Sequence, residues 1–336
     1  MFKTKIIVLI LILICIINAS IFIGKYSISM QEYVLFIKSI FSGESLLDSS
    51  KYEILKGVIL NIRFPRIITA VMIGSALAIS GAVFQAMFVN PLVSPGILGV
   101  LSGASFGAAL GMVLGFGWFW INAFTFIFGF GAVLSALGIS LLYSKSQNMI
   151  ILVLGGVISS ALFGALLSII KYSADPYDTL PAITYWLMGS LSFSSPSTVW
   201  KLFLPMILGM LFLIWLSKYL NALSLGDEEA KALGINTKAV KVSVILLATL
   251  ISALSVVLAG IIGWIGLIIP HITRLLFGAD NKKIVLASGI IGAIFLLIVD
   301  NFSRMMLTFE IPIGILTSII GIPIFIIVLK NAKKGF

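Results

Sequence analysis

The side chains that most often perform chemistry in proteins are few in this sequence and lie far apart. His271 is the single histidine and Cys15 the single cysteine among the 336 residues. A zinc site needs three or four ligands, and His271 has no second histidine, cysteine or carboxylate close to it in the sequence, so we expect it to be structural. No G-x-x-x-x-G-K-[ST] phosphate loop occurs, and no Ser/His/Asp or Cys/His set can be assembled. We therefore predict no catalytic residue, no metal site and no cofactor bound by this chain.

The composition predicts that the chain is built from helices in a membrane. Hydrophobic residues make up 60% of the sequence, charged residues only 10%, and the mean hydropathy is +1.20. A soluble domain carries about a quarter charged residues, so this chain lacks the polar surface to face water on all sides. Because a membrane-crossing helix needs about 20 apolar residues, stretches without Asp, Glu, Lys or Arg mark the candidate crossings. They cover residues 6–24, 67–144, 146–170, 179–200, 202–217, 242–273, 284–299 and 311–329.

The longest of these stretches has to fold back on itself into three crossings. The predicted breaks are Asn90-Pro91 with Pro95, and Gly115-Phe116-Gly117. We predict an all-α, polytopic membrane protein with about ten transmembrane helices, one of them short, in a single domain over residues 1–336. The first stretch lacks a good cleavage site, so we expect an uncleaved first helix rather than a signal peptide.

Charge asymmetry predicts the orientation of these helices. With both termini in the cytoplasm, the inner segments hold thirteen basic and four acidic residues, and the outer segments hold nine and eight. This excess obeys the positive-inside rule. The net charge of +10 therefore indicates topology and contact with anionic lipid, and not binding to nucleic acid.

Segments outside the crossings have their own patterns. We expect residues 25–62 to be a polar outer segment, with the second crossing running from Pro65 to about Met87. Residues 172–200 are too polar to face lipid, so we place a short helix there near the outer mouth and begin the sixth crossing at about Trp200. Small residues repeat every four positions in two crossings, which favours close helix packing. They are Ala70, Gly74, Ala78, Ala82 and Ala86, and then Gly103, Gly107, Gly111 and Gly115.

The inner segment 221–241 contains the signals of a short, capped helix. Ser224 and Asp227 have the spacing of a capping box, and three acids follow in the first turn, where the helix dipole favours negative charge. Gly234 has the position of a C-terminal stop. We predict a helix of about two turns over Gly226–Leu233, built to contact another protein.

The predicted crossings contain no charge near their middle. Such charges mark proton relays and ion-coupling sites in secondary transporters. Asp300, Arg304 and Glu310 fall toward one mouth instead. This disfavours, but does not exclude, a secondary transporter driven by an ion gradient, because sodium sites can be built from backbone carbonyls and hydroxyls. An intramembrane enzyme is a third hypothesis.

Four long sequence blocks resemble the permease subunits of type II ABC importers, the family that takes up iron–siderophores, haem and cobalamin. The blocks are R-F-P-R through N-P-L-V-S-P-G-I-L-G at 63–99, L-G-D-E-E-A-K-A-L-G-I at 225–235, G-I-I-G-W-I-G-L-I-I-P-H-I-T-R at 260–274, and E-I-P-I-G-I-L-T-S-I-I-G-I-P-I-F at 310–325. The resemblance implies ten helices and a homodimer around a central pathway. It also implies two cytoplasmic ATPase subunits, which would hold the ATP and Mg, and an extracytoplasmic substrate-binding protein.

The resemblance also assigns roles to residues. The short helix, within about 224–236, would dock into the ATPase through Leu225, Gly226, Asp227, Glu228, Ala230, Leu233 and Gly234. Arg63, Arg66 and Arg304 would face outward and receive acidic residues of the binding protein. A cytoplasmic gate would form from Asn90, Pro91 and Leu92 with Asn148 and Met149, the last two lying in the block Gln147-Asn148-Met149. Each role has an alternative. The short helix could be only a capped surface loop, the arginines could lie near lipid headgroups without docking a protein, and Met149 could begin a buried helix face and not form a gate.

Two positions depart from the family's pattern. The residue before Asn90 is often basic and is Val89 here, and the acidic-His-Arg that often follows the eighth helix reads Asp280-Asn281-Lys282-Lys283. We expect little functional consequence from either. The sequence thus predicts a multi-pass permease of the bacterial inner membrane that imports a metal chelate. A ferric siderophore is the first expectation, with haem, cobalamin or a metal oxyanion as alternatives.

Overall fold

The computed structural model describes residues 2–42, 47–143, 149–193 and 195–332, with side chains up to residue 327. The regular elements of this part of the chain are all helical. They are α1 (Phe2–Phe22), α2 (Met30–Ser42), α3 (Ser49–Lys56), the π-helical η1 (Gly57–Arg63), α4 (Phe64–Met87), η2 (Pro95–Leu98), α5 (Val100–Val113), α6 (Trp118–Tyr143), α7 (Met149–Ser173), α8 (Thr179–Leu187), η3 (Leu191–Phe193), α9 (Pro196–Leu223), α10 (Asp227–Ala232), α11 (Thr237–Ala259), α12 (Ile265–Phe277), α13 (Asn281–Met305) and α14 (Ile313–Ala332).

Ten apolar helices confirm the predicted membrane architecture. Seven in the described residues are long and apolar enough to cross a membrane, and α5, α12 and α14 are shorter apolar helices. The stretch 67–144 forms three helices, α4, α5 and α6, with breaks at the predicted turns. The 14 residues of α5 and the 13 residues of α12 span about 21 and 20 Å, less than the ~30 Å of hydrocarbon, so more than one helix is short, where the sequence predicted one.

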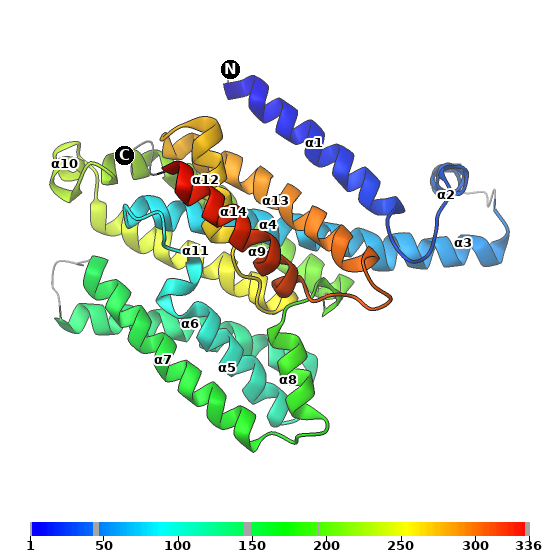
Figure 1. Ribbon diagram of the computed structural model, residues 1–336, viewed down its shortest axis with the longest axis horizontal. Helices are drawn as coiled ribbons and strands as arrows, with labels where there is room; N and C mark the ends of the chain where they lie inside the picture. Colours follow the sequence, from blue (N-terminus) through cyan, green and yellow to red (C-terminus); the bar gives the residue numbers. More distant parts are fainter. Residues whose placement is uncertain (1, 43–46, 144–148, 194, 333–336) are drawn as a thin grey trace.

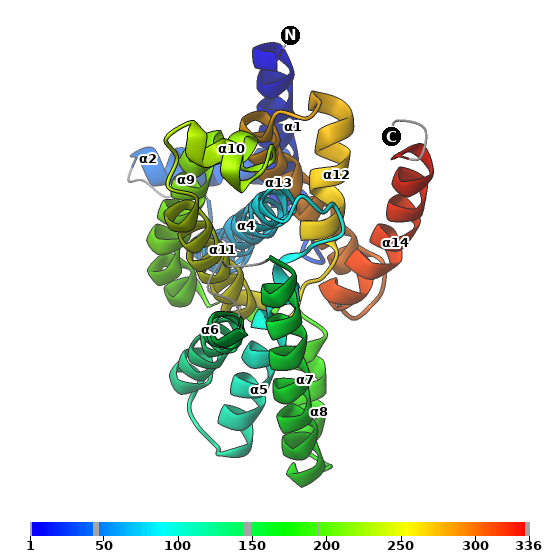
Figure 2. The same ribbon diagram turned by 90° about the vertical axis from the view of Figure 1, so that its left-hand side faces the viewer.

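The helix α4 lies at the centre of the larger of two helix groups. Figure 2 shows α4 nearly end-on, with α9, α11, α12 and α13 around it. Almost every side chain of α4 is buried. The helices α5, α6, α7 and α8 form the second group, which Figure 1 shows below the first, and α11 joins the two through its contacts with α5 and α6.

Gly74 and Gly103, from the two predicted stripes of small residues, lie where helix backbones touch, whereas the predicted stripe residue Gly115 lies past the end of α5 and has nothing within 4 Å of an added Cβ atom. A Cβ atom added to Gly74 of α4 would lie 2.3 Å from the carbonyl oxygen of Gly292 in α13. Gly81 of α4, which the predicted stripe did not include, makes an even closer contact, because its added Cβ atom would lie only 1.8 Å from the carbonyl oxygen of Gly266 in α12. Gly103 of α5 faces the Phe128 carbonyl of α6 in the same way. Any larger side chain would force these helices apart, which explains the glycines.

The helix that contains the second crossing begins before Pro65, where the sequence predicted its start, although the α-helical segment α4 itself begins at Phe64. The helix runs without interruption from Ser49 to Met87, and Pro65 lies inside it. The preceding turn, Gly57–Arg63, is π-helical, and the Phe64 N–H donates to the carbonyl of Ile59 five residues back. Proline has no N–H to donate, and its ring crowds the previous turn of an α-helix. Because the π turn before Pro65 is wider, it accommodates both effects without ending the helix.

The segment 172–200 contains the predicted short helix, α8. Its Ile183 and Trp186 are buried, so α8 packs against the bundle. The next crossing, α9, starts at Pro196 and not at Trp200, because Ser195 caps it by accepting a hydrogen bond from the Thr198 N–H at 3.2 Å.

Candidate functional site

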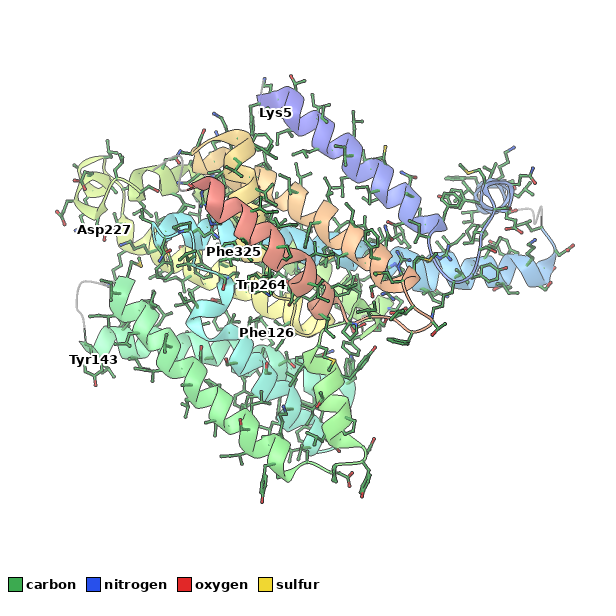
Figure 3. The ribbon with its side chains drawn as sticks, in the orientation of Figure 1. Lys5, Phe126, Tyr143, Asp227, Trp264 and Phe325 are labelled. Carbon is green, nitrogen blue, oxygen red and sulfur yellow. The ribbon has the colours of Figure 1, made fainter. Side chains whose placement is uncertain are left out.

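The short helix α10 extends from one end of the molecule, where Figure 3 labels Asp227. Its C-terminal end is a complete Schellman motif. The Gly234 N–H donates to the Lys231 carbonyl at 2.9 Å, and the Ile235 N–H donates to the Ala230 carbonyl at 3.1 Å. Gly234 adopts φ +77°, a conformation that favours glycine. The predicted helix and its stop at Gly234 are therefore confirmed to within one residue at each end.

The predicted capping box at the start of α10 is wrong. Gly226, and not Ser224, is the N-cap of α10, and it has no side chain with which to cap. Ser224 instead ends α9, where its hydroxyl donates to the Leu220 carbonyl at 2.8 Å. The pattern Ser-x-x-Asp misled because the same serine can close the preceding helix.

The surface of α10 combines a buried anchor with exposed side chains. Ala230 is fully buried against the bundle, whereas Leu225 and Leu233 are 67% and 66% exposed. Lys241 Nζ of α11 donates to Asp227 Oδ2 at 2.5 Å, and this ion pair connects α10 to the next crossing. Glu228, together with Lys231, stays at the surface. Two exposed leucines flanking a charged turn are suited to contact with another protein.

A polar clamp holds the base of α10 to the start of α13. Asn221 donates from Nδ2 to Asp280 Oδ1 at 2.9 Å and accepts the Asn281 N–H at 2.8 Å, and Asn281 donates to the Ser224 hydroxyl at 3.2 Å. The hydrogen bond from Asn221 is the main reason why the pKa of Asp280 lies below its usual value. The sequence reasoning missed Asn221, and it assigned little consequence to Asp280-Asn281, whose role stays untested.

The first predicted gate segment follows α4. The Asn90 carboxamide accepts the Leu92 N–H at 2.9 Å, and the Leu92 side chain is 56% exposed. Val89, at φ +47°, is in a left-handed conformation that is unfavourable for a β-branched residue. Met149 begins α7 and packs partly against the main core, in line with the buried-face alternative. Asn148 and Gln147 lie outside the described residues, so the gate pairing stays a prediction.

Side chains of α12 hold the gate segment in place. His271 Nε2 lies 3.1 Å from the Pro91 carbonyl, which agrees with the structural role expected for this histidine. Gln85, 2% exposed, donates to the Leu267 carbonyl at 3.2 Å and accepts from Arg274 Nη1 at 2.5 Å. Sequence reasoning missed Arg274, although it lies in the same block as His271.

Of the three predicted docking arginines, Arg66 and Arg304 pair with Asp300, at the end of the molecule opposite α10. Arg66 donates from Nε to Asp300 at 2.8 Å and from Nη1 to Glu310 at 2.9 Å, and Arg304 Nε lies 3.1 Å from Asp300. Arg63 donates to the carbonyls of Ile21 and Tyr26. We name Arg66, Asp300, Arg304 and Glu310 the ion cluster.

The arginines are buried, whereas the sequence prediction placed them facing outward. Arg63, Arg66 and Arg304 are 4%, 8% and 6% exposed, and Asp300 is fully buried. Burial by itself would raise the pKa of Glu310, but the hydrogen bond from Ser192 and the positive charges of Arg66 and Arg304 outweigh it and lower this pKa. Each guanidinium therefore has a partner inside the chain, and docking by a second protein stays a prediction.

A cavity of about 420 Å³ lies between the start of α14 and the segment 261–264. Met188, Trp264 and Ser318 are among its lining residues, which are mostly apolar. Trp264 stacks edge-on against Phe325 of α14 with 6.2 Å between ring centroids, and Figure 3 labels both side chains. The cavity is open at the surface of the described chain.

Comparison with known proteins agrees with this architecture over nearly the whole chain. The model of the FecCD transport family matches residues 9–331. The chain belongs to the FecCD transport family. The resemblance to permease subunits of type II ABC importers is thereby confirmed, and this FecCD permease has the all-α fold expected for them.

Individual relatives cover almost all of the FecCD permease. MolB, the molybdate import system permease protein of Haemophilus influenzae, is 38% identical over 315 residues, which are 93% of this chain and 91% of MolB. The hemin transport system permease protein HmuU of Yersinia pestis is 34% identical over 87% of this chain and 89% of its own. A solved structure described as an inward-facing metal-chelate type ABC transporter superposes with a TM-score of 0.86 at 37% identity, covering 98% of this chain and 99% of that one.

Proposed function

We propose that this permease imports a metal chelate across the bacterial inner membrane, as one half of a homodimer that is driven by two separate ATPase subunits. The observation that carries this proposal is α10, a short helix fixed at its base and exposed at its tip. Lys241 and the clamp of Asn221 with Asp280 connect it to three crossings. A displacement of α10 would therefore be transmitted to α9, α11 and α13 together.

Several other features support the remaining parts of the proposal. The cavity beside α14 opens at the surface of the single chain, as expected for one half of a pathway that a second copy completes. The ion cluster lies at the opposite end from α10, where a substrate-binding protein would dock. The excess of basic residues in the predicted inner segments taken together, thirteen against four acidic residues, supports cytoplasmic termini.

Within this class we propose a ferric siderophore as the substrate to test first. Molybdate is the second candidate, because the molybdate permease MolB is 38% identical over 93% of this chain. The experiment measures uptake into vesicles that contain the whole complex and ATP, with the proton and sodium gradients collapsed by ionophores. We expect ATP-dependent uptake of one of these substrates. Uptake that stops when the gradients collapse would favour a secondary transporter instead.

The role of α10 has its own test. Leu233→Ser removes an exposed apolar contact from the tip of α10, and Leu307→Ser removes one, 47% exposed, at the opposite end. We expect the first variant to lose association with the ATPase and the second to keep it, with both variants inserting normally. Equal association in the two variants would contradict the coupling role.

A further inference from the structure

The helix α1 is attached to the bundle at its two ends and touches it little in between. Ser20 is the one buried side chain of α1 among the described residues, and it accepts a hydrogen bond from Asn301 at 2.8 Å. At the other end Phe2 packs edge-on against Phe277 of α12, with 5.6 Å between ring centroids. Figure 1 shows α1 running alongside α13 at the edge of the bundle.

An apolar groove of about 310 Å³ lies between the start of α1 and the end of α12. Its walls are the first turns of α1 and the last turn of α12: Thr4, Lys5, Val8, Leu9, Leu276 and Phe277. Val8 and Leu276 are 48% and 47% exposed, so the groove opens outward from the bundle. Because α1 crosses the membrane, the medium beside this groove is hydrocarbon, and an acyl chain can fill it without burying a polar group.

Positive charge surrounds the mouth of this groove. Lys5 Nζ donates to the Leu276 carbonyl at 2.8 Å and lies 5.6 Å from the centre of the Phe277 ring. An ammonium has three N–H donors, and this carbonyl takes one of them. Lys283 Nζ lies 5.8 Å from the centre of the Phe2 ring, which brings a second ammonium to the same end of α1.

The charges at this end do not balance within the chain. The start of α1 carries Lys3 and Lys5, and the segment from the end of α12 into the first turn of α13 carries Lys282 and Lys283. The acid of these two segments is Asp280, which is already bonded to Asn221 and paired with Lys283 at 3.2 Å. A ligand with both a phosphate and an acyl chain would supply the missing negative charge and fill the groove.

We propose that this groove binds one anionic phospholipid, with an acyl chain between α1 and α12 and its phosphate at Lys5. The apolar walls favour a lipid over free phosphate, which would leave the groove empty. The bound lipid would fix the N-terminal half of α1, which has few protein contacts, against α12. This inference does not depend on the proposed substrate or on the ATPase.

The test is a titration of the purified full-length permease with dioleoyl-phosphatidylglycerol and with dioleoyl-phosphatidylcholine, followed by native mass spectrometry. The two lipids have the same acyl chains and differ in net charge. We expect the permease to retain phosphatidylglycerol in preference to phosphatidylcholine. Lys5→Gln keeps a donor for the Leu276 carbonyl but removes the charge, and it is expected to weaken phosphatidylglycerol binding about fivefold. The matched control Lys238→Gln removes an exposed charge at the start of α11 and is expected to leave binding unchanged.

A second pair of variants tests the groove itself. Val8→Trp fills the groove, whereas Ile7→Trp adds the same bulk at the neighbouring, 57% exposed position that does not line it. We expect the first to lose the bound lipid and the second to retain it. Equal retention in these two variants, or equal effects of the two lysine changes, would overturn the proposal. Equal binding of the two lipids by the unaltered chain would also overturn it.

Discussion

Removing the carboxylate of Asp300 should destabilise the permease more than any other single change in the ion cluster. Asp300 is fully buried and lies 2.8 Å from Arg66 and 3.1 Å from Arg304. Breaking a buried ion pair on one side leaves an uncompensated charge and typically costs about 3–5 kcal/mol. We therefore expect Asp300→Ala to lower the free energy of unfolding by ~3–5 kcal/mol. Asp300→Asn, which retains an acceptor for Arg66, should cost about 1.5–3 kcal/mol.

The matched comparison is Glu310→Ala, because Glu310 pairs with the same Arg66 at 2.9 Å but its side chain is 32% exposed. Partial solvation weakens the pair, so we expect a loss of at most about 1 kcal/mol. Reversible denaturation of the purified permease in mixed micelles measures both variants. A loss for Asp300→Ala no larger than that for Glu310→Ala would refute the assignment of Asp300 as the buried centre of the cluster. The double variant Asp300→Ala/Arg304→Met should lose less free energy of unfolding than the sum of the two single variants. Each substitution removes a charge that the other substitution would leave buried without its partner.

Three further predictions follow from the structure. Folding lowers the pKa of Glu310, so the stability that this carboxylate contributes is fully present above the ordinary carboxyl pKa and is lost as the pH falls through the lowered value. In chemical denaturation, the stability difference between wild type and Glu310→Gln should be constant at neutral pH and vanish at pH values below the lowered pKa. Gly234→Pro cannot adopt φ +77° and removes a helix-ending N–H, so ATP-driven vesicle uptake should fall to background while membrane insertion, measured by protease protection, stays normal. Gly81→Ala should lower the melting temperature, because the new Cβ atom would collide with the Gly266 carbonyl and lower the free energy of unfolding by about 1–3 kcal/mol. The control Gly131→Ala adds a Cβ atom where no other atom lies within 4 Å, and it should leave the melting temperature unchanged.

Local patterns in the sequence were sufficient for the elements that depend on local chemistry. The run of apolar residues and its Pro and Gly breaks predicted ten helices, because each crossing must satisfy its own backbone in the membrane. The stop at Gly234 was predictable since a Schellman motif requires a left-handed residue at one position. The predicted stripe containing Gly74 indicated close packing, although not the partner helices, and it did not include Gly81, which makes the closest of these contacts.

The errors arose where a residue has two local options and tertiary contacts select one. Pro65 was read as a helix start, but a π turn carries the helix through it. Ser224 could cap the next helix or close the previous one, and Asn281, 57 residues away in the sequence, bonds to it in the second arrangement. The pairing of Arg66 with Asp300 and Glu310 was not predicted, because these two acids lie more than 230 residues away in the sequence and no local pattern connects them to Arg66.

The central claim is that the motive force reaches this permease from separate subunits through α10. The most direct test compares substrate accumulation in two sets of vesicles, with a substrate gradient opposing uptake. One set contains the purified chain alone, and the other contains the chain with its ATPase, its binding protein and ATP. We predict accumulation against the gradient only in the second set. Accumulation by the chain alone would contradict the claim.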